Sequence, residues 1–517
     1  MEGKTSPLQH SATPTQSPLP DTRFEEYPGT RLLVDRQHLL SSEHEGHDFV
    51  LIPQPSDSPD DPLRWSSLRK YISLGIVCLY SFMVAALTLT GGLLYGALIA
   101  EFGATVAYLN VGTAVGLLFI GISNLFWSPL AMKFGRRPVY LLSAMLTVAS
   151  QIMGAYATSK SVYNGSRFLM GIAAGPFEQL PAVTVDDQFF VHHRGLGLSW
   201  YLLGATTGSF LGPIATGFVI QSMGWRWVLR FYAIFMGMIA VIIFFGLEET
   251  GFDRQAHTFG NTASEQPSPR SQKSYWAKLR LLTVLPTEKS LLMTTLEPCA
   301  MLLHPIVIWS GCVYGFAIAW LVVMSTSANI VFQNPAFGYN FSSTAMGLTN
   351  ISPLIGGVVF LYAGGAGTDR FMVWQARRNN GVMEPESRIY SVFIGGPIMA
   401  AGLFLYGPGA AAGLHWIAPV FGMGLIGAGI PIAGEVALGY VTEAYPSRPG
   451  PASAAVITIR NVIACAMVFA SDPWIIHNGL RDTFLTMGFL CLAVFLSGIL
   501  MIWKGKGCRK RSVKSNK

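Results

Sequence analysis

The sequence of 517 residues has few charged side chains: Asp, Glu, Lys and Arg together make up only 12% of it. Soluble globular proteins carry about 25% of these residues, because polar side chains must cover the surface around a buried core. Hydrophobic residues make up 51% of the chain. The shortage of charge therefore excludes a soluble globular protein of this size and indicates a surface that faces lipid.

Cysteine is also scarce, and its six residues show none of the patterns that hold a metal or a disulfide framework. They are scattered, no Cys-x-x-Cys pair occurs, and most fall inside apolar segments, where cysteine behaves as a small hydrophobic residue. His192-His193 has no metal-ligand spacing around it, and the Gly-rich loop ending in Lys-Ser/Thr that binds nucleotide phosphates is missing. We therefore expect no metal, no cofactor and no enzymatic activity.

A folded basic domain is missing as well, although the formal net charge is +7. The basic residues gather in short segments between apolar segments and at the C-terminus, as in membrane proteins. We expect a monomer whose partners are the lipid bilayer and a small-molecule substrate, and no nucleic acid.

Apolar segments long enough to cross a bilayer, about 20 residues each, are abundant. They lie near residues 72–92, 107–127, 138–157, 165–186, 197–220, 227–247, 306–331, 344–364, 389–408, 415–440, 453–472 and 482–503. The sequence thus predicts an all-α membrane protein with twelve transmembrane helices in two pseudo-symmetric sets of six. Its expected parts are a disordered tail (1–64), a six-helix domain (65–248), a central loop (249–304), a second six-helix domain (305–503) and a basic tail (504–517).

The basic residues alternate between the loops in a way that predicts the topology. One side receives Lys133, Arg136, Arg137, Arg194, the basic residues of the central loop, Arg370, Arg377, Arg378, Arg388, Arg448 and the tail from Lys504. The other side keeps Lys160, Arg226 and Arg230. By the positive-inside rule, both termini are cytoplasmic and the number of spans is even. The plasma membrane is the expected location, with a vacuolar or other internal membrane as the alternative.

Two loops carry similar motifs at corresponding places of the two halves. Gly135-Arg136-Arg137 follows the second span, and Asp369-Arg370 follows the eighth. Glycine permits a tight turn, and the arginines can pair with acidic groups or helix ends and so hold one conformation. A topological signal without any such lock is the alternative. The similarity of these motifs in the two halves indicates a duplicated architecture.

The fourth span carries two charged residues on one predicted face. Arg167, Gly171, Gly175 and Glu178 are spaced by 4, 4 and 3 residues, which places them on one side of a helix. Charges on a membrane helix are costly toward lipid, so this face should point inward, and the glycines allow a neighbouring helix to come close. Glu178 is a candidate for proton or substrate coupling, and a structural ion pair is the alternative. Arg167 is also a candidate, although it could extend to the bilayer surface.

The fifth span contains Gly208, Gly212-Pro213 and Gly217. Regularly spaced small residues form a flat face, and Pro213 removes a backbone donor and bends the helix. This pattern suits a helix that moves between two states, and simple close packing is the alternative.

In the second half, four residues are candidates for contact with a substrate or a proton. Glu435 lies in the tenth span and Arg460 in the eleventh, at similar depths, so the two side chains could pair; an ion pair that holds the bundle together and a contact with the substrate are the alternatives. Tyr314 and Trp320 of the seventh span could line a cavity for a flat or cationic ligand. Outside the spans, Asn340-Phe-Ser342 and Asn164-Gly-Ser166 are possible N-glycosylation sites.

Together these motifs resemble the major facilitator superfamily, and in particular its fungal twelve-span branch of drug:proton antiporters. Gly135-Arg136-Arg137 is similar to the family's signature loop between spans two and three. Residues 167–175 resemble its fourth-span motif, and residues 208–217 resemble its antiporter motif. Residues 61–65, 248–254 and 384–388 are similar to further signatures of the fungal branch, so that the resemblance extends from about residue 50 to residue 503.

The chain departs from the family pattern at several positions. Met132 stands where the family usually has Asp, so the state-locking ion pair is expected to be missing from the first half and kept by Asp369 in the second. Thr216-Gly217 replaces the usual Gly-Gly pair, and Arg64 replaces an Asn.

The resemblance implies two six-helix domains around a central cavity that opens alternately to either side of the membrane. From the residues, a shielded carboxylate can exchange a proton for a substrate, with Glu178 as the first candidate and Glu435 as the second. The resulting hypothesis is proton-coupled export of a small organic compound such as a drug, toxin or secondary metabolite. The alternatives are proton-coupled import of a polyamine or other organic cation, and a membrane sensor that transports nothing.

Overall fold

The computed structural model describes residues 31–32, 44–45, 49–50, 61–252, 291–333, 338–379, 382–446 and 448–515. Most of the expected N-terminal tail, most of the expected central loop and the end of the basic tail lie outside the described residues. Within them the chain is almost entirely helical, and strands of two residues form two small antiparallel pairs: β1 (Arg31–Leu32) with β4 (Val382–Met383), and β2 (His44–Glu45) with β3 (Phe49–Val50).

The helices fall into two sets along the chain. The first comprises η2 (Pro62–Arg64), α1 (Ser67–Leu89), α2 (Gly91–Phe102), α3 (Val106–Phe134), α4 (Arg136–Ala155), α5 (Lys160–Ala174), η3 (Gly175–Glu178), α6 (Leu180–Gln188), α7 (Val191–Met223) and α8 (Trp225–Gly246). The second comprises α11 (Leu291–Met301), α12 (Pro305–Gln333), α13 (Ser343–Leu348), α14 (Ile351–Arg378), η6 (Pro385–Ser391), α15 (Val392–Ala411), α16 (Ile417–Ala444), α17 (Pro449–Leu496) and α18 (Gly498–Ser515).

Eleven segments of the described chain are long and apolar enough to cross a membrane. The last of them, Pro449–Lys510, has 62 residues, and a straight helix of that length would extend roughly 90 Å, about three times the thickness of the hydrocarbon layer. At Gly479 the backbone turns to φ 76° and ψ 164°, a conformation open to glycine, and divides the segment into two helices. The predicted all-α membrane fold is confirmed, and the last of the eleven segments consists of two helices rather than one.

Two sequence-based boundaries are wrong. The segment 93–106, expected to be a loop, mostly forms α2, because its apolar residues continue the helical chain beyond Thr90 until Gly103 ends it in the left-handed conformation. The fourth span, expected to be one helix, is interrupted by η3. Within the expected central loop, Leu291–Met301 forms a separate helix, α11, and Pro298 is accommodated within it.

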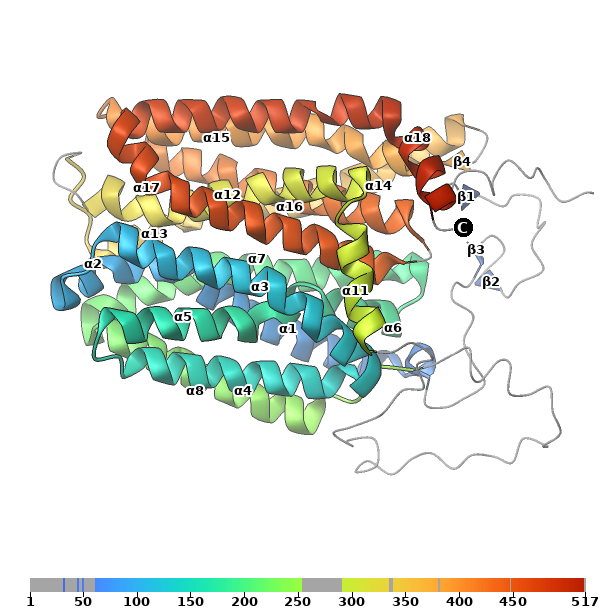
Figure 1. Ribbon diagram of the computed structural model, residues 1–517, viewed down its shortest axis with the longest axis horizontal. Helices are drawn as coiled ribbons and strands as arrows, with labels where there is room; N and C mark the ends of the chain where they lie inside the picture. The colour runs from blue at the N-terminus through green and yellow to red at the C-terminus, as the bar shows by residue number, and fades with distance from the viewer. Residues whose placement is uncertain are drawn as a thin grey trace, which may run out of the picture.

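The two sets of helices lie side by side along the long axis of the molecule (Figure 1). The first set, blue to green, forms the lower part of the view, and the second set, yellow to red, forms the upper part. Helices pack mainly within their own set, as α1 does on α7 and α15 on α16, while α3 packs against α17, and α7 against α13 and α14, across the boundary. We refer to residues 67–246 as the first half and to residues 305–515 as the second half.

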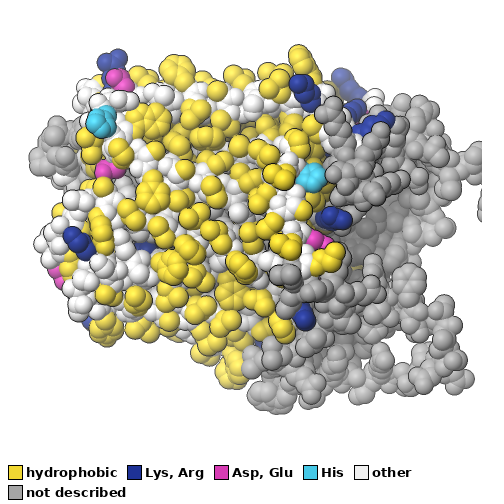
Figure 2. All heavy atoms as spheres, viewed as in Figure 1, with side chains coloured by type: hydrophobic (Ala, Val, Ile, Leu, Met, Phe, Trp, Pro, Cys, Tyr) yellow, Lys and Arg dark blue, Asp and Glu magenta, His cyan; other side chains and the backbone are white. Residues whose placement is uncertain are grey.

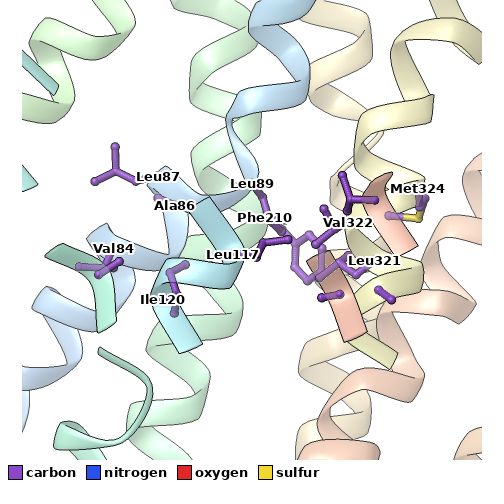
Figure 3. Close-up of a cluster of buried hydrophobic side chains, with 14 of the residues drawn as sticks. Val84, Ala86, Leu87, Leu89, Leu117, Ile120, Phe210, Leu321, Val322 and Met324 are labelled. Atoms are coloured by element: carbon purple, nitrogen blue, oxygen red, sulfur yellow. The ribbon is translucent and has the colours of Figure 1, made fainter. Parts of the chain in front are cut away.

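Hydrophobic side chains cover the broad face of the molecule, and charged side chains gather at its two ends (Figure 2). Large apolar residues such as Phe126, Phe235 and Ile355 are more than half or nearly half exposed, which suits a surface in contact with lipid. The interior is apolar as well. Figure 3 shows Leu117 and Phe210 of the first half beside Leu321 of the second, within one buried cluster.

One end of the bundle carries the start of α1, the turn between α3 and α4, η6 and α18; it lies at the right of Figure 1 and is called the charged end. Here α18 docks on η6 through two ion pairs of different burial. Arg509 and Glu386 are joined at 2.7 Å, with side chains 0% and 6% exposed. Lys506 and Glu384 are joined at 2.6 Å, with side chains 51% and 26% exposed.

This difference predicts unequal effects of the same substitution on one helix. Arg509→Met leaves the Glu386 carboxylate buried without its partner, a change that costs about 3–5 kcal/mol, and should lower the melting midpoint of the purified protein clearly. Lys506→Met breaks a half-exposed pair worth about 0–1 kcal/mol and should barely change it. Equal midpoints for the two variants would contradict a buried pair at Arg509.

Candidate functional site

The most deeply buried carboxylate between the two halves belongs to Glu178, at the break in the fourth span. The regular helix α5 ends at Ala174 because Pro176 and Pro181 remove backbone donors on either side, and the chain continues as the tighter η3. Glu178 is the last residue of η3 and is 9% exposed. The break turns its side chain toward the second half.

The Glu178 carboxylate is satisfied entirely from α17. Its Oε1 forms an ion pair with the Arg460 guanidinium, and both side chains are 7% exposed. Its Oε2 accepts a hydrogen bond from Asn461 Nδ2 at 3.0 Å. The Tyr314 ring lies 4.8 Å from the guanidinium carbon of Arg460, close enough for a cation–π contact. A buried charge is tolerated when it is paired and hydrogen-bonded in this way.

Neutral contacts on both sides of the ion pair hold the halves close. Thr458 donates a hydrogen bond to the carbonyl oxygen of Gly121 at 3.2 Å, and a Cβ on Gly121 would lie only 2.8 Å from Cβ of Asn461. Toward the charged end, Gln179 Nε2 donates to the carbonyl oxygen of Gly450 at 2.9 Å. The small size of Gly121 is therefore what allows α3 and α17 to approach.

The sequence-based pairing of Glu435 with Arg460 is wrong in this conformation. Glu435 instead accepts a hydrogen bond at 3.1 Å from Arg388 of η6, and Arg388 also pairs with Glu443 at 2.6 Å. Neighbouring positions of a helix differ by about 100° in direction. Glu435 points toward the α14 side, near Gly364, whereas Arg460 points toward α12 and the first half.

Arg167 lies in the same broken span but is not brought to Glu178. It is 8% exposed, and its Nη1 lies 3.5 Å from Met170 Sδ. It reaches α2, where a Cβ on Gly91 would lie 2.8 Å from its Nη2. Glu178 follows Arg167 by eleven positions, roughly 16 Å along a helix, so the two charged side chains do not share one site.

The turn at Gly135 is built around an acidic residue that the sequence motif does not contain. Gly135 has φ 98°, and the backbone N–H groups of Arg136 and Arg137 donate to the Glu249 carboxylate at 2.8 and 3.2 Å. The Arg136 side chain pairs with Asp187 at 3.1 Å. Although the family's Asp is replaced in this loop, an arginine–carboxylate pair is therefore present, and Asp187 near the end of α6 supplies the carboxylate. The Glu-Glu signature after the sixth span was the signal for Glu249.

In the second half, Asp369 does not form the expected ion pair. It is exposed and, like Arg370, makes no ion pair within the part of the chain that the structure describes. Arg388 takes the corresponding place, with Glu435 and Glu443 as its partners. The residue missed from sequence is thus Arg388, which the Glu384–Arg388 signature contained.

The glycines of the motifs mark close helix contacts. Gly171 approaches the backbone of Gly116, and Gly208 approaches the backbone of Phe82. Gly212 and Gly217 follow the same pattern. A Cβ on Gly212 would lie 2.6 Å from Cβ of Ala86, within the first half. A Cβ on Gly217 would lie 2.6 Å from the carbonyl oxygen of Ser343, which belongs to the second half. Gly175 packs in the same way on Trp127, and Pro213 is contained within α7.

The remaining predicted residues lie away from the Glu178 site. Trp320 is fully buried and packs on Phe316 in the interior of the second half. Asn340 is exposed, so its glycosylation stays a prediction. Asn164 donates a hydrogen bond to the carbonyl oxygen of Tyr108 at 3.0 Å and packs against α3, and its glycosylation likewise stays a prediction.

At the end opposite the charged end, Glu101 of α2 joins helices of the first half. It accepts hydrogen bonds from the Trp225 indole at 2.7 Å and from the Arg226 guanidinium at 2.8 Å. These two hydrogen bonds lower the pKa of Glu101, which therefore stays ionised at neutral pH.

Residues 76–469, well over half of the chain, match the family model of the Major Facilitator Superfamily. The chain belongs to this superfamily. An uncharacterized transporter of the superfamily from Schizosaccharomyces pombe is 30% identical, with 96% of this chain and 94% of that protein covered. Protein HOL1 of Saccharomyces cerevisiae is 27% identical, with 89% and 90% covered.

The solved structure of the xylose transporter XylE from E. coli, in a partially occluded inward-open conformation, has the same fold. It matches with a TM-score of 0.59 over 84% of this chain and 99% of that chain, at 14% identity. The major facilitator fold predicted from the motifs is confirmed. The protein is a multi-pass membrane protein and a secondary transporter of the major facilitator type, rather than an enzyme.

The partner of Arg460 can be tested in this transporter by a double-mutant cycle. Glu178→Gln and Arg460→Met should each lower the melting midpoint, and the double variant should lose less than the sum, with a coupling of about 1–3 kcal/mol. As the matched control, Glu435→Gln combined with Arg460→Met should be close to additive, because Glu435 pairs with Arg388. A larger coupling in the control cycle would restore the sequence-based pairing.

Proposed function

We propose that this transporter exports a small organic compound in exchange for protons, with Glu178 as the group that couples the two. The single observation that carries this proposal is the position of the Glu178–Arg460 pair. Among the ion pairs between described residues, it is the one that joins the first half to the second; the others lie within residues 65–248 or within residues 305–515.

The chemistry of the pair suits a switch operated by a proton. Ionised Glu178 attracts Arg460 at short range in a site shielded from water, where charge interactions are strong. A proton on Glu178 removes this attraction and leaves a neutral group that is less costly to bury alone. The contact between η3 and α17 is then weakened while the contacts inside each half keep their charges. Protonation therefore favours separation of the halves at this site.

The ionised carboxylate is also a binding group for the substrate. A hydrogen-bond-donating or cationic group of a substrate can take the place of Arg460 at the Glu178 carboxylate, and the Tyr314 ring beside the pair offers a flat apolar face. A proton on Glu178 removes this acceptor charge. A substrate and a proton thus compete for one carboxylate, which is the requirement for exchange.

Contacts at both ends of the bundle support alternating access. At the charged end the halves meet through Glu178, Arg460 and the Gln179–Gly450 hydrogen bond. At the opposite end α2 packs against α12, and α7 packs against α13. We take the charged end as cytoplasmic, because it carries most of the basic side chains, and the plasma membrane as the location.

Glu178→Gln tests the coupling role. In membrane vesicles with an imposed pH gradient, this variant should lose gradient-driven accumulation of substrate, because a glutamine cannot release a proton. It should keep downhill exchange of labelled for unlabelled substrate, which needs no proton. Glu384→Gln, which removes an exposed charge paired with Lys506, should retain both activities.

The orientation of the vesicles separates export from its alternative. Proton-driven accumulation in inside-out vesicles supports export, whereas accumulation in right-side-out vesicles, of a polyamine for instance, makes the protein an importer of organic cations. Accumulation by Glu178→Gln at the wild-type rate would remove this residue from the mechanism in either direction.

A further inference from the structure

A second carboxylate lies at the interface between α3 and α17, and the mechanism proposed above does not use it. Asp472 of α17 shares a small cavity with Asn110 of α3 and with Thr326 and Ser327 of α12, near the end opposite the charged end. The cavity has a volume of about 10 Å³, close to the lower limit of about 10–15 Å³ for a single water molecule. Its walls come from both halves of the protein.

The register of the two helices places this cavity on the same line as the Glu178 site. The helices run antiparallel, with Gly121 opposite Asn461 at one contact and Asn110 beside Asp472 at the other. Each pair of positions is separated by eleven residues, which is three turns and roughly 16 Å along both helices. Apolar residues such as Leu117 occupy the interval. The contact between α3 and α17 therefore has two polar sites, with apolar residues between them.

The hydroxyl groups around the cavity are arranged to accept rather than to donate. Asn110 accepts a hydrogen bond from the Tyr95 hydroxyl at its Oδ1, at 3.0 Å, and keeps a second lone pair on this oxygen. Thr326, Ser327 and Ser471 each donate their hydroxyl hydrogen to the carbonyl oxygen three residues earlier, at 2.8–3.2 Å. These three side chains are 2–4% exposed. With the hydrogens committed to the backbone, oxygen lone pairs are what the hydroxyls can offer to the cavity.

Asp472 adds a negative charge that no described residue neutralises. It is half-buried and makes no ion pair or hydrogen bond within the described part of the chain. A carboxylate held between two apolar helices without a cation is costly. One negative charge surrounded by neutral hydroxyl oxygens matches a single positive charge, whereas divalent ions are usually held by several carboxylates.

We propose that Asp472, together with the oxygen atoms of Asn110, Thr326, Ser327 and Ser471, binds a monovalent metal cation. Sodium is the first choice because it is smaller than a water molecule and fits the cavity, and hard cations of this kind prefer oxygen ligands. A bound ion takes ligands from both halves. It therefore favours the conformation in which α3 and α17 touch at this end, by the amount of its binding free energy in that state.

The test measures binding without transport, so it stands or fails separately from the proton-coupling role of Glu178. The full-length protein, purified in detergent without substrate, is melted at fixed pH and equal ionic strength in choline, sodium or potassium chloride. We expect a saturable rise of the melting midpoint by about 1–3 °C in sodium over choline, and a smaller rise in potassium. Equal midpoints in the three salts would overturn the proposal.

For each variant, the melting midpoint in sodium chloride is compared with the midpoint of the same variant in choline chloride. A variant that is less stable in every salt therefore does not obscure the result. Asp472→Asn should abolish the sodium effect, while Asp482→Asn, which removes an exposed carboxylate from the helix that follows Gly479, should keep it. Ser471→Ala removes one neutral ligand and should raise the sodium concentration for half-maximal effect several-fold. An unchanged sodium response in both Asp472→Asn and Ser471→Ala would assign the effect to another site.

Discussion

The structure depends on one constraint: a charge inside a bilayer must have a partner. Glu178 and Arg460 meet this constraint for each other, although 282 positions separate them in the chain and they belong to different halves. Neither charge can leave the contact without being replaced by a proton, an ion or a substrate group. The interaction that closes the two halves on each other is therefore also the one whose loss has to be compensated during transport.

The other ion pairs between described residues serve a different purpose. Arg136 with Asp187, Arg388 with Glu443, and Arg509 with Glu386 each tie loops and short helices to their own half, at or near the charged end. Such pairs keep each half in one shape whichever way the halves are tilted. Because each half is rigid, protonation of Glu178 changes mainly the contact between the halves. It can therefore shift the equilibrium between the two arrangements of the halves.

The sequence was enough to predict the spans and the buried position of Glu178, because these depend on composition and on spacing along one helix. The partner of Arg460 could not be predicted from the sequence. That choice depends on the rotation of α16 and α17, in which one position changes the direction by about 100°, and on the break at Pro176 that turns Glu178 outward from its own half. The role of Glu249 at the Gly135 turn was also hidden, since the two residues are 114 positions apart and meet only after the six helices have packed.

The boundary between the halves has two unlike edges. On one edge α7 meets α13 through the neutral contacts of Gly217 with Ser343 and Gly347, where nothing titrates and the fit depends on small residues. On the other edge α3 and η3 meet α17 through charge, at Glu178 and again beside Asp472. A proton or an ion can change the strength of the second edge alone. The halves should therefore pivot about the glycine-lined edge, because it is the one whose contacts are the same in every protonation state.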